Sequence, residues 1–212
     1  MISLVTVHGL WMRGGSMAVL RRRLEPHGFD VSDFTYRSVT GSLAANVAAL
    51  AAHVDAVPGD TVHLVGHSLG GVLICALLES RRPPRLGRVV CLGSPLRGSR
   101  TAARLARWPG GKRLIGRCLA EVHARGGFVC WPPGVEVGSV AGRIPLGVGR
   151  LLGPFREPND GTVAVAETAI AGVTDHIVLP VAHMALLWST AVAAQTEQFL
   201  LHGRFNRGRV AG

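Results

Sequence analysis

One serine of this sequence lies in a setting suited to nucleophilic chemistry. Ser68 is the centre of the pentapeptide GHSLG at positions 66–70, which follows a short apolar run and opens the longer apolar stretch Gly70–Leu78. In a G-x-S-x-G turn between a strand and a helix, the serine backbone is strained and the two glycines prevent collisions across the turn. A tight turn that contains a serine by chance is the plainer alternative. The strand-turn-helix setting favours a nucleophile.

Two later residues could activate this serine, because a serine hydroxyl needs a histidine base and an acid that orients the base. His183 lies just past the apolar run that ends near Val181, and Asp160 follows the run Val135–Ala141. Asp175 is closer to His183 in sequence, but it begins the last run, so the two should lie at opposite edges of a sheet. A packed histidine and an ordinary Asn-Asp-Gly surface turn are the alternatives. We expect Ser68 to be the nucleophile, His183 the base and Asp160 the acid.

The first apolar run ends in the sequence HGLW at positions 8–11, where a loop could present an amide to the reacting oxygen. The amides of Leu10 and Leu69 would then form an oxyanion hole. We expect His8 to hold this loop by hydrogen bonds, and His67 to point away from the site.

Apolar side chains next to these positions are candidates to contact a substrate. They are Trp11, Met12 and Met184, together with the side chains of Leu10 and Leu69. Core packing is the alternative, and for Met184 it is equally favoured. Trp11, beside the oxyanion loop, is the best candidate for the mouth of a pocket.

Short β-branched runs alternate with helical stretches along the chain, which predicts a parallel sheet covered by helices on both faces. The helical stretches expected early in the chain are Ser16–His27 and Leu43–Val57. The expected strands are Ser3–His8, Val31–Tyr36, Val62–Gly66, Val89–Gly93, Val135–Ala141 and His176–Val181. In such sheets functional groups collect at the carboxyl ends of the strands. We expect one domain over residues 1–212.

Five stretches of the chain resemble, in the right order, motifs of the compact bacterial lipases and esterases among the α/β-hydrolases, and of inositol-deacylase-like domains. They are VTVHGLW, HLVGHSLGG, VVCLGSPLRGS, PNDGTVAVAE and VAHMALLWS. The resemblance implies a minimal three-layer α/β-hydrolase fold of about six mostly parallel strands, without the first two strands of larger members. Segments 97–130 and 142–158 leave room for flaps or lids.

The resemblance also implies a serine hydrolase that cleaves carboxylic esters, including lipid esters, through an acyl-enzyme and without metal or organic cofactor. An acyltransferase or thioesterase would use the same residues. A non-catalytic interaction module on this fold would lack a triad member, and none is missing here.

The net charge of +10 is concentrated between Arg81 and Arg125, where twelve lysines and arginines accompany one acid, Glu121. Arg100, Arg104 and Arg107 fall on one face of an expected helix, and Arg113 and Arg117 repeat the spacing. A solvated helix face and attraction to an anionic membrane surface explain this equally well. No nucleic-acid-binding motif accompanies the charge.

The remaining features favour a cytoplasmic protein, peripheral to membranes at most. The chain enters a strand-like run at once, without a signal-peptide pattern. The uncharged stretch His176–Thr196 is long enough for a membrane span, but Pro180 and its histidines favour a buried strand followed by a helix.

Overall fold

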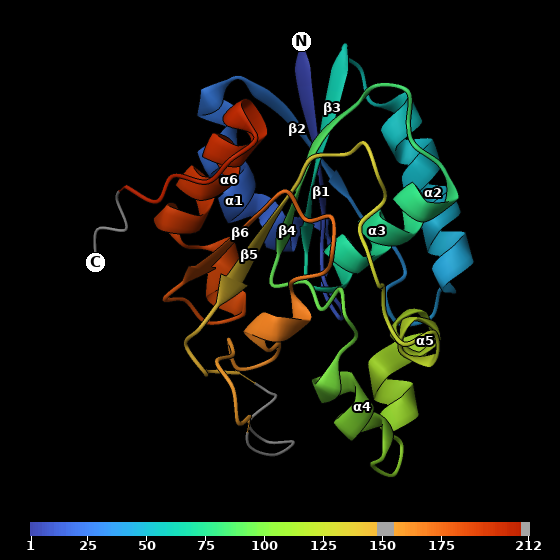
Figure 1. Ribbon diagram of the computed structural model, residues 1–212. Coiled ribbons are helices and arrows are strands. Elements are labelled where there is room, and N and C mark those ends of the chain that lie inside the picture. The colour runs from blue at the N-terminus through green and yellow to red at the C-terminus, as the bar shows by residue number, and fades with distance from the viewer. Residues whose placement is uncertain (148–154, 209–212) are drawn as a thin grey trace.

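The computed structural model describes residues 1–147 and 155–208, and its centre is one six-stranded sheet (Figure 1). All strand pairs are parallel, in the order β2-β1-β3-β4-β5-β6. The strands are β1 (Ile2–Val7), β2 (Phe29–Phe34), β3 (Thr61–His67), β4 (Leu86–Leu92), β5 (Val137–Gly142) and β6 (Asp175–Leu179). Each of the six expected strands is present, with ends shifted by up to three residues.

Helices cover both faces of this sheet, as the alternating pattern predicts (Figure 1). Helices α2 (Leu43–Ala56) and α3 (Leu69–Ser80) lie on one face, and α1 (Ala18–Leu24) and α6 (Thr190–His202) lie on the other. The expected helix from Ser16 to His27 is divided, since short 3-10 turns precede and follow α1. This arrangement confirms the three-layer prediction.

Alternating side chains of the central strands build two cores. Leu64 of β3 packs with α2 and α3, whereas its neighbour Val65 packs with α1 and α6. Val89 and Val90 of β4 divide in the same way. Because both faces are buried, these strands are continuous apolar runs in the sequence rather than alternating ones.

The uncharged stretch near the C-terminus forms β6, a short 3-10 turn η5 (Met184–Leu187) and most of α6, as expected. Within residues 1–147 and 155–208, every helix is too short or too polar to cross a bilayer.

Two further helices, α4 (Arg100–Ala106) and α5 (Gly111–Ala124), lie beyond the carboxyl ends of the strands (Figure 1). Both belong to the connection between β4 and β5, within the segment 97–130 expected to form a flap. We call α4, α5 and the turn 107–110 between them the roof. The second expected flap, 142–158, includes residues 148–154, which lie outside the described residues.

Candidate active site

Ser68 occupies a strained turn between β3 and α3. Its backbone has φ 53° and ψ −118°, a region that residues other than glycine rarely adopt. A Cβ atom on Gly66 would lie 2.4 Å from the amide nitrogen of Gly71, and one on Gly70 would lie 2.1 Å from the carbonyl oxygen of Val7. Both glycines are therefore required by close backbone approach.

The loops after β5 and β6 bring Asp160 and His183 together. Nδ1 of His183 lies 2.7 Å from Oδ2 of Asp160, and both side chains are almost completely buried. The other carboxylate oxygen, Oδ1, accepts hydrogen bonds from the amides of Thr162 (2.9 Å) and Val163 (2.7 Å). A carboxylate at this position keeps the hydrogen of His183 on Nδ1, so Nε2 presents a lone pair.

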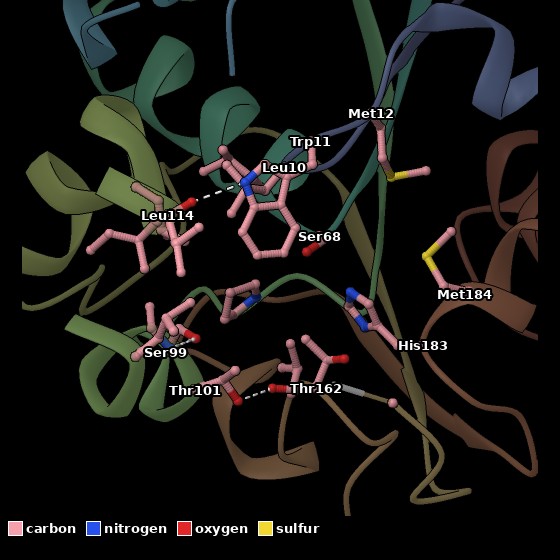
Figure 2. A pocket seen from close by; sticks show the side chains of 18 of the residues that line it. Leu10, Trp11, Met12, Ser68, Ser99, Thr101, Leu114, Thr162, His183 and Met184 are labelled. Carbon is pink, nitrogen blue, oxygen red and sulfur yellow. Dashed lines mark hydrogen bonds between the residues drawn. The ribbon is translucent and has the colours of Figure 1, made fainter. Parts of the chain in front are cut away.

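Ser68 and His183 line the same cavity, which has a volume of about 640 Å³. Figure 2 shows both residues around this cavity, with Met12 and Met184 on the side of His183 and Leu114 on the opposite side. The wall also includes Leu10, Trp11 and Leu69. All five side chains expected near a substrate thus border the cavity, and their contact with a substrate stays a prediction.

The amides of Leu10 and Leu69 are available at this cavity. Leu69 is the first residue of α3, where amides have no helical acceptor and the helix dipole favours negative charge. Neither amide has a hydrogen-bond acceptor among the described residues. A Cβ atom on Gly9 would lie 3.2 Å from Cβ of Ser68, so the loop approaches the serine closely.

His8 holds this loop, as expected. Its ring stacks on Tyr36 with 4.5 Å between ring centroids, and Nδ1 lies 2.8 Å from the carbonyl oxygen of Gly9. The hydroxyl of Tyr36 donates to the carbonyl oxygen of His8 at 2.9 Å. Burial lowers the pKa of His8, which keeps the ring neutral.

The expectation that His67 points away from the site is wrong. Its ring lines the cavity, with its centroid 4.8 Å from that of His183. Burial, and secondarily the charge of His183, lower the pKa of His67 to about 3. Strand β3 extends to His67 rather than ending at Gly66, and Nε2 of His67 lies 3.2 Å from the main-chain oxygen of His183.

The roof is tied to the oxyanion loop by Trp11. The indole Nε1 donates to the carbonyl oxygen of Leu114 in α5 at 2.9 Å (Figure 2). The backbone of Trp11 has a positive φ of 59°. Helix α5 is interrupted at Gly116, which has φ 71°, and the amide of Arg117 donates to Val39 instead of continuing the helix.

A buried carboxylate that sequence reasoning missed connects the roof to the loop of Asp160. Glu167 accepts hydrogen bonds from the amide of Arg100, at the start of α4, and from the amide of Ala164 (2.7 and 2.8 Å). Burial raises the pKa of Glu167 although these amides oppose the shift. No local pattern marks this role, which depends on residues 67 positions apart.

Many cations of the segment Arg81–Arg125 have structural partners. Their ion pairs are Arg81–Asp55, Arg88–Glu136, Arg125–Glu79, Arg100–Glu157 and Arg117–Glu121. Arg104 lies over the ring of Phe155. Arg113 and Arg117 do not repeat the arginine face of α4, because the break at Gly116 separates them.

Comparisons with known proteins agree with this architecture. A family model described as alpha/beta hydrolase fold matches residues 18–110. The mature lipase BlEst2 of Bacillus licheniformis aligns with a TM-score of 0.75 and 19% identity, over 95% of this chain and 91% of that chain. A metagenomic carboxyl esterase aligns with a TM-score of 0.63 and 23% identity, over 95% of this chain and 74% of its own.

A lipase-esterase related protein from Clostridium acetobutylicum aligns with a TM-score of 0.66 and 12% identity, over 93% of this chain and 94% of that chain. A comparison of the sequence with curated proteins gives no match. At these identities the structural likeness concerns the fold. The chain has the α/β-hydrolase fold, and bacterial lipases and esterases are among its structural neighbours.

Proposed function

We propose that this protein is a serine hydrolase of carboxylic esters, with Ser68 as nucleophile, His183 as base and Asp160 as acid. One observation carries the proposal: a strained serine between two obligatory glycines shares a cavity with a histidine whose Nδ1 is held by a buried carboxylate. A structural turn would not need the histidine–carboxylate pair. The esterase and lipase names of the structural neighbours agree with this chemistry.

The steps follow from the proposed roles. Oγ of Ser68 attacks the ester carbonyl while Nε2 of His183 takes its proton, and the amides of Leu10 and Leu69 donate to the carbonyl oxygen as it becomes negative. The C–O bond of the ester then breaks, and Nε2 returns the proton to the leaving alcohol. Water, deprotonated by the same nitrogen, then attacks the acyl-enzyme. The bond between the acyl carbon and Oγ breaks, Nε2 returns the proton to Oγ of Ser68, and the acid is released.

The acyl half of the substrate fits the apolar part of the cavity. Roof side chains dominate this wall, and Leu69 closes it toward α3. The apolar roof residues that line it are Ala102, Leu105, Trp108, Leu114, Ile115 and Leu119. Burial of an acyl chain against such a wall stabilises the bound substrate by about 0.8 kcal/mol for each methylene.

The test uses a fluorophosphonate probe and p-nitrophenyl esters of graded acyl length. Ser68 should be the labelled residue, and Ser68→Ala should abolish labelling and lower kcat by about 10⁴-fold or more. Turnover should increase with acyl length until the apolar part of the cavity is filled. Full labelling of the alanine variant would refute the proposal.

We also propose that the mouth of the cavity approaches an anionic lipid surface. Five large apolar side chains that line the cavity are 41–62% exposed: Trp11, Trp108, Leu114, Leu146 and Met184. Arg107, Lys112 and Arg113 flank them in the roof, and these cations have no acidic partner in the described part of the chain. Apolar contact and attraction of cations to anionic headgroups act together at such a surface.

Reversing Arg107, Lys112 and Arg113 to glutamate should weaken binding to anionic vesicles and leave hydrolysis of a small neutral ester unchanged. Each cation near such a surface contributes about 1 kcal/mol, so the loss should exceed 100-fold. The matched control reverses three cations that have acidic partners elsewhere in the fold, Arg81, Arg88 and Arg125. Equal loss in both variants, or no vesicle binding by the parent protein, would contradict the proposal.

A further inference from the structure

The imidazole of His67 leaves one nitrogen without a partner beside the nucleophile. Nε2 lies 3.2 Å from the main-chain oxygen of His183, and because a carbonyl oxygen only accepts, Nε2 carries the hydrogen. The pKa lowered to about 3 prevents a second proton from binding near neutral pH. Nδ1 therefore presents a lone pair, and this buried atom has no hydrogen-bond partner.

An unpaired buried acceptor is costly and uncommon, so it calls for an explanation. Among the described residues, three buried side-chain atoms lack a partner: Nε of Arg21, Nδ1 of His67 and Nε1 of Trp131. Of these three residues, only His67 lines the cavity. Nδ1 itself has almost no accessible surface, so a ligand in the cavity can supply the missing donor once a neighbouring side chain moves.

Nδ1 faces the oxyanion loop at the point where this loop has no side chain. A Cβ atom on Gly9 would lie 3.1 Å from Nδ1, 3.2 Å from Sδ of Met12 and 3.2 Å from Cβ of Ser68. The acceptor, the serine and the thioether of Met12 therefore all lie close to Gly9. Met12 has a flexible, unbranched side chain that can move aside for a ligand group.

The position of Nδ1 corresponds to the alcohol half of an ester. Figure 2 shows Met12, Met184 and His183 on one side of Ser68, opposite the roof residue Leu114. His183 must stand next to the leaving oxygen to protonate it, and the ring of His67 is 4.8 Å from that of His183. The acyl half occupies the roof side, so a donor that reaches Nδ1 belongs to the alcohol.

We propose that Nδ1 of His67 accepts a hydrogen bond from a second hydroxyl of the substrate alcohol, on the carbon next to the one that bears the ester oxygen. His67 is then a specificity-determining residue, and the preferred substrates are monoesters of 1,2-diols, including glycerol. This inference rests on the proposed ester hydrolysis at Ser68.

Three esters of one fatty acid test the preference in the unmodified protein: the 2-hydroxyethyl, 2-methoxyethyl and propyl esters. The methoxy group matches the hydroxyl in position but cannot donate a hydrogen bond. We expect kcat/KM for the 2-hydroxyethyl ester to exceed that for the other two by about tenfold, the usual size of one buried neutral hydrogen bond. Equal values for the three esters would overturn the inference and leave the proposed function intact, whereas no turnover of any ester would refute both.

Two variants of His67 distinguish the roles of its two ring nitrogens. His67→Gln keeps an N–H group near the position of Nε2 and removes the acceptor at Nδ1, whereas His67→Asn keeps an oxygen near Nδ1 and removes the donor to His183. The hydroxyl preference should fall to twofold or less in the glutamine variant and persist in the asparagine variant. The preference is the ratio of kcat/KM values for two esters measured on one preparation. An inactive misfolded fraction lowers both values equally and leaves this ratio unchanged.

The opposite pattern would assign the effect to the bond with the carbonyl of His183 and overturn the inference. A hydrolytic water is the other possible donor, and it would serve every ester through the same acyl-enzyme. An equal fall in turnover of the three esters in His67→Gln, with the preference unchanged, would show that Nδ1 serves this water and would also overturn the inference.

Discussion

Replacing Asp160 with asparagine changes one atom of the site and reverses one hydrogen bond. Oδ1 of Asp160 accepts from the amides of Thr162 and Val163, so the oxygen of an asparagine side chain would stay with these two donors. Its NH₂ group would then face Nδ1 of His183 and donate to it. The hydrogen of the imidazole moves to Nε2, the nitrogen that must take the proton of Ser68.

The expected effect on catalysis is large and the effect on stability is small. A histidine locked in the wrong tautomer costs about 10⁴-fold in kcat, or about 5.4 kcal/mol of transition-state stabilisation. The fold should tolerate the change, because every hydrogen bond of the loop keeps a partner and the amide of His183 still donates to the carbonyl oxygen of Asp160. The free energy of unfolding should therefore change by about 1 kcal/mol or less.

Initial rates on a p-nitrophenyl ester and denaturation in urea measure the two effects separately. Asp175→Asn is the matched control, since Asp175 pairs with Arg207 and accepts from the amide of Phe205 at the far end of β6. The control should lower stability and leave kcat within about threefold. An asparagine at position 160 that retains a tenth of the parent kcat would refute the assignment of the acid.

Three further predictions concern the stability of the site. Gly70→Ala should lower the free energy of unfolding by about 2–3 kcal/mol, because its Cβ would lie 2.1 Å from the carbonyl oxygen of Val7. The control Gly15→Ala should be tolerated, because a Cβ there would have no atom within 4 Å. Equal losses of the two variants in urea denaturation would contradict this reasoning. The lowered pKa of His67 means that below pH 6.5 the unfolded chain binds a proton that the folded chain does not, so stability present above pH 6.5 is lost as the pH falls toward 3. At pH 5 His67 contributes about 2 kcal/mol to this loss, and His8, His63 and His176, whose pKa values burial also lowers, contribute in both proteins. The fall in stability between pH 7.5 and pH 5 should therefore be about 2 kcal/mol smaller in His67→Gln than in the parent protein. Glu167→Ala should cost about 2–4 kcal/mol because the amides of Arg100 and Ala164 lose their acceptor, and Glu167→Gln should recover part of this loss, since one amide oxygen can still accept; an alanine variant as stable as the parent would disprove the role of Glu167.

The sheet could be predicted because its signals are local. Buried parallel strands are short apolar runs, and Gly59-Asp60 and similar pairs separate them from the helices. Strand ends have no such local signal, since pairing with neighbours decides them: β4 begins at Leu86 rather than Val89 because it continues beside β3. The setting of Ser68 was equally visible, because a G-x-S-x-G turn is a property of five consecutive residues.

Contacts between distant residues could not be predicted in the same way. Asp160 and His183 were found through the topology of the sheet, since both follow strands whose carboxyl ends meet at one edge. The direction of the His67 ring is fixed by the carbonyl of His183, 116 positions later. The bond from Trp11 to Leu114 spans 103 positions, and its acceptor lies beside a helix break that a single glycine in a helical pattern does not reveal.

The roof and the three proposed site residues lie in different connections of the sheet. The roof is inserted between β4 and β5, which are neighbours in the sheet, so the strands can pair whatever the length of the insert. The three residues proposed to carry the chemistry follow β3, β5 and β6, outside the insert. A roof of another length or sequence would therefore change the wall proposed to hold the acyl chain and leave the strands that carry these three residues unchanged. A different roof would still have to form the hydrogen bonds that hold it to the site, such as the bond from Trp11 to Leu114.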